Sequence, residues 1–229
     1  MRQAIATFLA VMILTAATSA FAAEAKCKAI KLFGPQKSCC GKVLWKAIGE
    51  TADADADAIW ERDGDVLVLK AGPKGYIRTE ADYTNFTLTL EFRRPEGKEP
   101  GKGGILFRIT GEDRIWPKSL EAQINSPDAG DFWGLCGYKF EGPADRFMQL
   151  EHDTFGTLRN LKTLDGTEKP IGQWNTYTVI ADGDTVTLKI NGKVVNKATG
   201  CDVVAGKICL TAEGDEIHFR NVKLVPMAD

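Results

Sequence analysis

The stretch Ser119–Asn125 holds the polar residues whose types and spacing could support chemistry. Side chains alternate between the two faces of a β-strand, so one face here is apolar and the other carries a carboxylate and two amides. The apolar set is Leu120, Ala122 and Ile124, and the polar set is Glu121, Gln123 and Asn125. Burying such polar groups costs free energy unless they bind something polar. This polar face is therefore the candidate site.

Two neighbouring segments, 88–93 and 105–109, alternate in the same way and carry charged side chains off their apolar faces. If the three strands lie in one sheet, their polar side chains share one face. These side chains are Glu91, Arg93, Arg108, Glu121 and Gln123. The alternative is a solvated outer face, as antiparallel sheets often have. On such a face the arginines pair with the glutamates across strands, at about 0.2–1 kcal/mol for each pair.

The same stretch limits the kind of glycoside chemistry that the chain can perform. A retaining glucanase needs a nucleophile and an acid, two carboxylates about 5–5.5 Å apart. Glu121 is followed in register by Gln123, so this strand lacks the second carboxylate. The two-carboxylate mechanism is therefore disfavoured unless Glu91 or Glu213 comes across the cleft to supply it.

The elements that must position these residues are short strands separated by turn residues. The expected strands are 60–63, 66–69, 76–79, 85–93, 104–110, 120–125, 174–181, 185–190, 193–197, 206–212 and 216–225. Asp182-Gly183 and Asn191-Gly192 predict two hairpins in succession. In the last strand the apolar positions change parity near Arg220-Asn221, which predicts a bulge or burial on both faces. With no helix and no repeat expected, the pattern predicts an all-β, two-sheet antiparallel sandwich of jelly-roll type.

Residues 126–170 form the longest stretch without a clear period, and they hold Trp133 and His152 among glycine, proline and aspartate residues. A region this long without secondary structure is often functional in a compact domain. We therefore treat Trp133 and His152 as candidate contacts to a ligand.

The beginning of the chain predicts export. Residues 1–22 have a basic start, an apolar run and a small-residue cleavage site, as in a secretory signal peptide. The apolar run is shorter than the about 20 residues of a membrane anchor, and no later stretch is long enough to span a bilayer. We expect a periplasmic or extracellular protein with a cysteine-containing segment at 23–42 and a sandwich domain at 43–229. Its 29 basic and 31 acidic residues give no reason to expect nucleic acid as a partner.

Six cysteines follow the predicted signal peptide, and an even number in an oxidising compartment favours disulfides. Cys201 and Cys209 flank a predicted turn and form the favoured pair, while Cys27 could pair with Cys39 or Cys40. The acidic stretch 51–58 does not fit an EF-hand, because neither the glycine nor the final glutamate of that loop is in place. No cofactor is required by the sequence, and a divalent metal such as calcium stays open.

Several short motifs follow one another in a characteristic order. They are Glu91-Phe92-Arg93, Gly103–Arg108, Leu120–Ile124, Ile171–Asn175, Ile190-Asn191-Gly192, Gly206–Leu210 and His218–Val222. In this order the chain from Val43 to Val225 resembles the 3-keto-disaccharide hydrolase domain family, secreted bacterial proteins with the concanavalin A-like sandwich. The chain departs from the family at Lys102-Gly103-Gly104, where Asn-Ser-Gly is common, and at Thr211, where glutamine is common.

The resemblance implies a glycoside-cleaving hydrolase that acts on 3-keto-glycosides, with a carbohydrate as its partner. A ketone at carbon 3 acidifies the proton on carbon 2, so one base can start an elimination that breaks the glycosidic bond. The residues expected to act are Glu121 as base, Arg108 at the enolate oxygen, Gln123 as orienter and Glu91 or Glu213 as acid. Arg93, Trp133, Glu213 and His152 are the expected substrate contacts. The rival hypothesis is a non-catalytic carbohydrate-binding or cell-surface adhesion domain that uses the same face.

Overall fold

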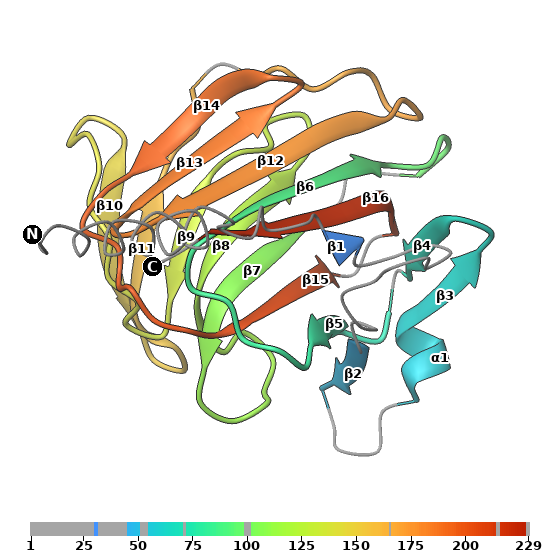
Figure 1. Ribbon diagram of the computed structural model, residues 1–229, viewed down its shortest axis with the longest axis horizontal. Helices are drawn as coiled ribbons and strands as arrows, with labels where there is room; N and C mark the ends of the chain where they lie inside the picture. The colour runs from blue at the N-terminus through green and yellow to red at the C-terminus, as the bar shows by residue number, and fades with distance from the viewer. Residues whose placement is uncertain are drawn as a thin grey trace, which may run out of the picture.

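The computed structural model describes residues 30–31, 45–50, 55–70, 72–98, 102–164, 166–213 and 216–227. Two antiparallel sheets of eight strands each pack face to face (Figure 1), which confirms the predicted all-β sandwich. Among the described residues one short helix, α1 (Ala56–Ile59), interrupts the strands. A single helical turn is too short to show a 3.6-residue period, so the sequence pattern did not indicate it.

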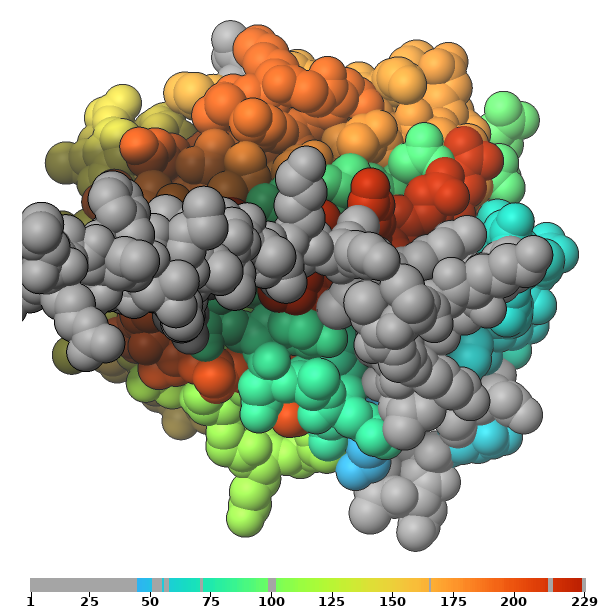
Figure 2. Space-filling view, viewed as in Figure 1, coloured from blue at the N-terminus to red at the C-terminus, as the bar shows by residue number. Residues whose placement is uncertain are grey.

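Sheet A consists, in spatial order, of β14 (Lys193–Ala198), β13 (Thr185–Ile190), β12 (Asn175–Asp182), β6 (Phe86–Arg93), β16 (Ile217–Pro226), β4 (Val66–Leu69) and β3 (Trp60–Asp63). The short strand β1 (Ile30–Lys31) pairs with β16. Figure 2 shows one face of the molecule, with the orange residues of β13 and β14 above the red residues of β16.

Sheet B consists, in spatial order, of β10 (Phe147–His152), β11 (Gly156–Leu161), β9 (Phe132–Leu135), β8 (Lys118–Asn125), β7 (Lys102–Thr110), β15 (Lys207–Glu213), β5 (Gly75–Thr79) and β2 (Trp45–Gly49). The strands β9, β10 and β11 lie in the stretch 126–170, where no strand was predicted. The sequence pattern missed them because β10 is an edge strand whose residues are all half-buried or exposed, and β9 is only four residues long.

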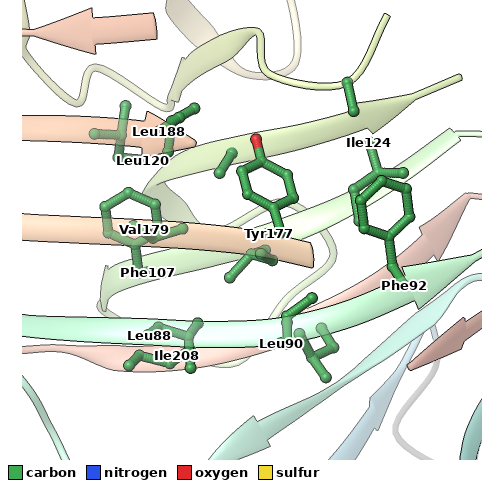
Figure 3. Packing of buried hydrophobic residues seen from close by; sticks show 14 of the residues in the cluster. Leu88, Leu90, Phe92, Phe107, Leu120, Ile124, Tyr177, Val179, Leu188 and Ile208 are labelled. Carbon is green, nitrogen blue, oxygen red and sulfur yellow. The ribbon is translucent and has the colours of Figure 1, made fainter. Parts of the chain in front are cut away.

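The core lies between the sheets, and alternation along the strands fills it. In β6 buried and half-buried residues alternate without exception. The rings of Phe92 and Tyr177 lie 5.9 Å apart within sheet A, and Phe86 meets Phe107 of sheet B edge-on at 5.8 Å. Figure 3 shows Phe92, Tyr177 and Phe107 among the side chains that fill the space between the two layers. Fully burying one such side chain stabilises the fold by about 1.5–3 kcal/mol.

The predicted turns and the predicted bulge are confirmed. Asn191 and Gly192 both have positive φ, 51° and 85°, as the two-residue hairpin turn between β13 and β14 requires. In β16 the pairing with β6 shifts between Arg220 and Lys223, and Asn221 has a φ of 53°. The extra residue explains why the apolar positions change parity along this strand.

The predicted disulfide between Cys201 and Cys209 is wrong, because both are free thiols, as is Cys136. Cys201 belongs to the core between the sheets, whereas Cys209 belongs to an apolar cluster on the outer face of sheet B. The two sulfur atoms therefore lie on opposite sides of one sheet, which neighbourhood along the chain cannot reveal. Cys27, Cys39 and Cys40, the predicted signal peptide and residues 51–54 of the acidic stretch lie outside the described residues. In the described part of the chain, no helix is long and apolar enough to cross a membrane.

Candidate functional site

The predicted polar face divides between the two sheets. Strand β6, with Glu91 and Arg93, lies in sheet A, whereas β7 and β8 lie in sheet B. The expectation that these charged residues share one face with Glu121 is therefore wrong. Alternation assigns a side chain to the inner or outer face of its own strand, but only strand pairing decides to which sheet that strand belongs.

On the outer face of sheet A, Glu91 and Arg93 both contact neighbouring side chains. Glu91 Oε2 accepts hydrogen bonds from Arg220 Nε at 2.7 Å and from Asn221 Nδ2 at 2.6 Å. Burial alone would raise the pKa of Glu91, but these two hydrogen bonds and the positive charges of Arg220 and Lys169 together lower the pKa. The guanidinium groups of Arg93 and Arg220 both stack on the ring of Trp174, at 4.7 and 4.0 Å from its centroid. These contacts form a self-contained cluster of cross-strand pairs.

Arg108 has left the face on which alternation placed it. A register shift between Phe107 and Thr110 gives Arg108 a φ of 52°, and its side chain is fully buried. Its guanidinium donates to main-chain oxygens at 2.7, 3.0 and 3.1 Å and also meets Asn85 and Tyr138. The acceptor carbonyls belong to Thr84, Gly183 and Asp202. The predicted place of Arg108 beside Glu121 is wrong, and the arginine instead ties three loops together.

Glu121, Gln123 and Trp133 do come together, on the outer face of sheet B. Strand register sets Glu121 of β8 directly opposite Leu106 of β7 and Trp133 of β9. The indole Nε1 of Trp133 donates to Gln123 Oε1 at 3.1 Å. This bond fixes the orientation of the amide next to the carboxylate.

Glu121 is buried without a partner for one of its oxygens. The residue is 3% exposed, and Oε1 has no hydrogen-bond partner among the described residues. Burial raises the pKa of Glu121 well above its usual value, and the carboxylates of Glu213 and Asp131 raise it further. Gly104 makes the room for this carboxylate, because a Cβ there would lie 2.5 Å from Oε1. The sheet therefore keeps, in an apolar setting, a carboxyl group that is poised to exchange a proton.

A small pocket on this outer face lies next to Glu121, which is not itself one of the walls. Leu106, the strand partner of Glu121, and Thr211, the strand partner of Gly104, line it. Its walls include Lys74, Tyr76, Leu106, Ile115, Trp116 and Glu213. Glu213 Oε1 accepts a hydrogen bond from Trp116 Nε1 at 3.0 Å. The pocket, with a volume of about 10 Å³, has room for about one water molecule. A pocket of this size is too small for a sugar ring while its walls, Trp116 among them, keep this arrangement.

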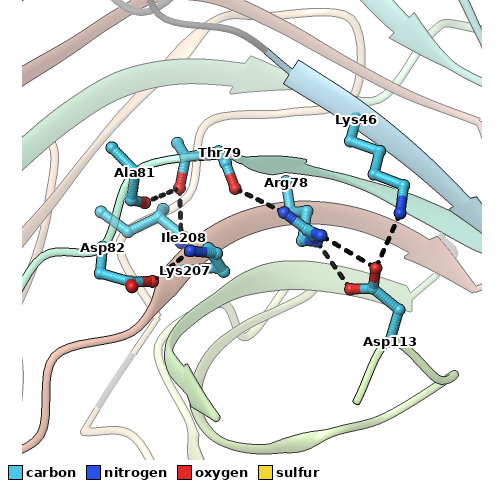
Figure 4. A network of polar contacts seen from close by, with 8 residues as sticks. All are labelled: Lys46, Arg78, Thr79, Ala81, Asp82, Asp113, Lys207 and Ile208. Carbon is cyan, nitrogen blue, oxygen red and sulfur yellow. Dashed lines mark hydrogen bonds and ion pairs between the residues drawn. The ribbon is translucent and has the colours of Figure 1, made fainter. Parts of the chain in front are cut away.

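Trp116 comes from the loop between β7 and β8, which polar contacts hold against the sheet. The Asp113 carboxylate accepts hydrogen bonds from Arg78 Nε at 2.7 Å and Lys46 Nζ at 3.1 Å (Figure 4). The Cys136 thiol donates to the Trp116 carbonyl at 3.3 Å, and Trp116 has a φ of 51°. Positive φ is uncommon for a bulky residue, so these contacts hold an unfavourable backbone conformation in place. Sequence reasoning missed Trp116 because nothing in a loop sequence shows which strand it covers.

His152 lies at the far end of a line of aromatic contacts that begins at Trp116. The Trp116 and Phe155 rings meet edge-on at 5.2 Å, and the Phe155 and His152 rings lie 4.8 Å apart. The exposed His152 accepts a hydrogen bond at Nδ1 from the Thr154 main-chain amide at 3.1 Å. This histidine therefore borders the candidate site rather than lining its pocket. No group of three or more metal-ligating side chains occurs among the described residues.

Comparison with known proteins identifies the family. The sequence profile of the 3-keto-alpha-glucoside-1,2-lyase-like domain matches residues 28–225. The chain belongs to this family. It is the 3-keto-disaccharide hydrolase family that the order of motifs indicated. Among curated proteins, none matches the sequence.

Solved structures similar to this member of the 3-keto-alpha-glucoside-1,2-lyase-like family support the fold. A β-glucanase of Bacillus licheniformis has a TM-score of 0.56 at 11% identity, with 88% of this chain and 98% of that chain covered. The carbohydrate-binding module CBM66 of Bacillus subtilis has a TM-score of 0.55 at 16% identity, with 79% of this chain and 94% of that chain covered. At such identities the likeness establishes the jelly-roll architecture, which both glycosidases and carbohydrate-binding modules use.

Proposed function

We propose that the protein cleaves the glycosidic bond of 3-keto-glycosides by elimination, with Glu121 as the base. The observation that carries the proposal is the buried Glu121 carboxyl group, which has an unpartnered oxygen and adjoins a pocket. Native proteins rarely leave a buried polar atom without a partner, and those that remain need an explanation such as a catalytic role. The family description names 3-keto-alpha-glucosides, and an elimination beside a ketone needs one strong base rather than two paired carboxylates.

The reaction has three steps, which are proton removal, loss of the leaving group and addition of water. Glu121 takes the proton from carbon 2, and the electron pair of that C–H bond forms an enolate with the ketone at carbon 3. The enolate collapses, the bond between carbon 1 and the glycosidic oxygen breaks, and the leaving alcohol takes up a proton. Water then adds its hydroxyl to carbon 1 and Glu121 returns its proton to carbon 2, while the remaining proton of the water restores the group that protonated the leaving alcohol, so that the net reaction is hydrolysis. A base whose pKa is raised toward the working pH is suited to the first step.

The other residues of the face support this reaction in different ways. Glu213 lies at the pocket wall and is placed to give the leaving oxygen its proton. Gln123 is fixed by Trp133 and orients sugar hydroxyls through its amide. The ring of Trp133 offers a face on which a sugar can stack. A non-catalytic binding domain would have the aromatic rings but no need for a partnerless buried acid.

The direct test is incubation of the purified protein with 3-keto-trehalose and, separately, with unoxidised trehalose. We expect release of glucose from the oxidised sugar alone, because only the ketone acidifies the proton on carbon 2. Substrate that carries deuterium at carbon 2 should be cleaved more slowly, with a primary isotope effect. Equal cleavage of both sugars would overturn the elimination mechanism, and saturable binding without cleavage would establish the carbohydrate-binding alternative.

A further inference from the structure

The elimination needs a positive group at the enolate oxygen, and Arg108 cannot supply it from its buried position. Negative charge develops on the oxygen at carbon 3 as the proton leaves, and a fixed donor at that point lowers the barrier. The described walls of the pocket contain two acidic or basic side chains, those of Glu213 and Lys74. Of these, Lys74 alone is a cation.

Strand register places Lys74 beside Glu213. Gly75 of β5 pairs with Ala212 of β15 in an antiparallel ladder, so the next position on each strand brings Lys74 opposite Glu213. The Lys74 carbonyl accepts a hydrogen bond from the Glu50 amide at 3.2 Å, which continues the ladder to the β2 side. The main chain of Lys74 is therefore fixed by the sheet although its side chain is exposed.

The indole of Trp116 bridges the lysine and the glutamate. Lys74 Nζ lies 5.1 Å from the centroid of the Trp116 ring, and the Nε1 of the same ring donates to Glu213. One flat ring thus contacts an ammonium through its face and a carboxylate through its edge. A sugar ring that displaces the indole would meet the same two groups. An exposed cation–π contact is weak, so a developing oxyanion can replace it.

We propose that Lys74 is the catalytic residue that stabilises the enolate, and that Trp116 holds its ammonium at the pocket until substrate displaces the indole. This role rests on the proposed elimination. As Glu121 takes the proton from carbon 2, the oxygen at carbon 3 gains negative charge and accepts a hydrogen bond from Lys74 Nζ. No bond to the lysine forms or breaks, and the lysine keeps its proton while the glycosidic bond breaks.

Lys102 offers a matched control. It pairs directly with Glu213 from the other side, in β7, and is likewise exposed. Lys102 thus places the same charge beside Glu213, but it does not line the pocket. A loss of activity caused merely by the net charge near Glu213 would therefore appear equally in variants of Lys74 and Lys102.

The test compares Lys74→Met, Lys74→Arg and Lys102→Met in cleavage of 3-keto-trehalose. We expect Lys74→Met to lower kcat by about 10²–10³-fold, the usual loss for one oxyanion donor, with a much smaller change in KM. Lys74→Arg should restore at least part of the rate, and Lys102→Met should match the wild type. Slower proton removal in Lys74→Met should also make the isotope effect at carbon 2 at least as large as in the wild type.

Two outcomes would overturn this role while leaving the elimination in place. They are an active wild type with an equally active Lys74→Met variant, and equal losses in the Lys74→Met and Lys102→Met variants. A loss that appears only in KM would also contradict it, because it would make Lys74 a binding residue. If the wild type cleaves neither sugar, the proposed function itself is wrong, and this role falls with it.

Discussion

The two outer faces of the sandwich carry glutamates that look alike in the sequence and differ in their surroundings. Glu91 on sheet A accepts two hydrogen bonds from neighbouring side chains, and its pKa is lowered. Glu121 on sheet B is buried with a partnerless oxygen, and its pKa is raised. Both residues alternate with core residues on their strands, Glu91 between Leu90 and Phe92 and Glu121 between Leu120 and Ala122. The neighbours of a carboxylate, rather than its position in a strand, therefore determine whether it stabilises the fold or remains available for chemistry.

Arg93 and Arg108 also look alike in the sequence and differ in their surroundings. Arg93 stays on the outer face of sheet A and stacks on Trp174, whereas Arg108 turns inward at a bulge and binds the carbonyls of three loops. Arg93 therefore lies on the surface, whereas Arg108 links buried segments of the chain.

Replacement of the base should have the largest effect. We expect Glu121→Gln to lower the rate of 3-keto-trehalose cleavage by about 10³-fold, within the range for loss of a general base. Glutamine keeps the shape of the side chain and removes a buried ionisable group, so the variant should fold at least as stably as the wild type. The matched control is Glu91→Gln on the other face, which should keep the wild-type rate. Similar rates for Glu121→Gln and the wild type would remove the distinction between the faces.

Replacement of the buried arginine should have the largest effect on stability. Arg108→Met leaves the carbonyls of Thr84 and Gly183 without this donor, and the Asp202 carbonyl keeps the hydrogen bond from the Tyr138 hydroxyl at 2.6 Å. Each buried unsatisfied acceptor costs about 1–3 kcal/mol. We expect the free energy of unfolding, measured with urea, to fall by about 3 kcal/mol or more. Arg93→Met on the outer face should cost less than about 1 kcal/mol. Equal losses for the two variants would show that the inward turn of Arg108 is not what stabilises the loops.

The raised pKa of Glu121 should appear in two pH profiles. The native state holds this proton at pH values where the unfolded chain, with a pKa near 4.5, has lost it. Stability relative to Glu121→Gln should therefore fall as pH rises from 4.5 through the folded pKa. Over the same window kcat/KM should rise, because the base acts only when ionised. Urea unfolding and initial rates at a series of pH values would check both, and a rate that is flat above pH 4.5 would contradict the assignment.

The effect of Glu91 on stability should depend on pH in the opposite direction to that of Glu121, and it should be the smallest of these effects. Its folded pKa is lowered, so its contribution to stability is present above the unfolded pKa near 4.5 and is lost as pH falls through the folded value. Because the Arg220–Glu91 pair is about one-third exposed, at 35% and 27%, we expect Glu91→Gln to cost about 0.5 kcal/mol at neutral pH. The difference between wild type and variant, measured with urea, should vanish in acid. If the difference in the free energy of unfolding between wild type and Glu91→Gln grows in acid, the lowered pKa of Glu91 is wrong.

The same residues show how much of the site could be predicted from the sequence. Alternation placed Glu121 and Gln123 together on a polar face, and both lie there. It also placed Glu91 on that face, because alternation carries no information about which strands pair. Arg108 was misplaced by a bulge, and Trp116 and Lys74 were missed because a loop and a strand end contribute them from elsewhere in the chain.

The amino-acid sequence by itself determined the two-layer β-sandwich, its hairpins and its family, since these depend on local alternation, on turn residues and on the order of short motifs. Only the tertiary structure decided which polar face is a candidate site. Whether a carboxylate is ionised, paired or without a hydrogen-bond partner depends on the side chains that other strands and loops bring within a few ångströms. Those neighbours are distant in the chain, so the electrostatics of Glu121 arise only when β7, β8, β9 and β15 pair and the loop bearing Trp116 closes over them.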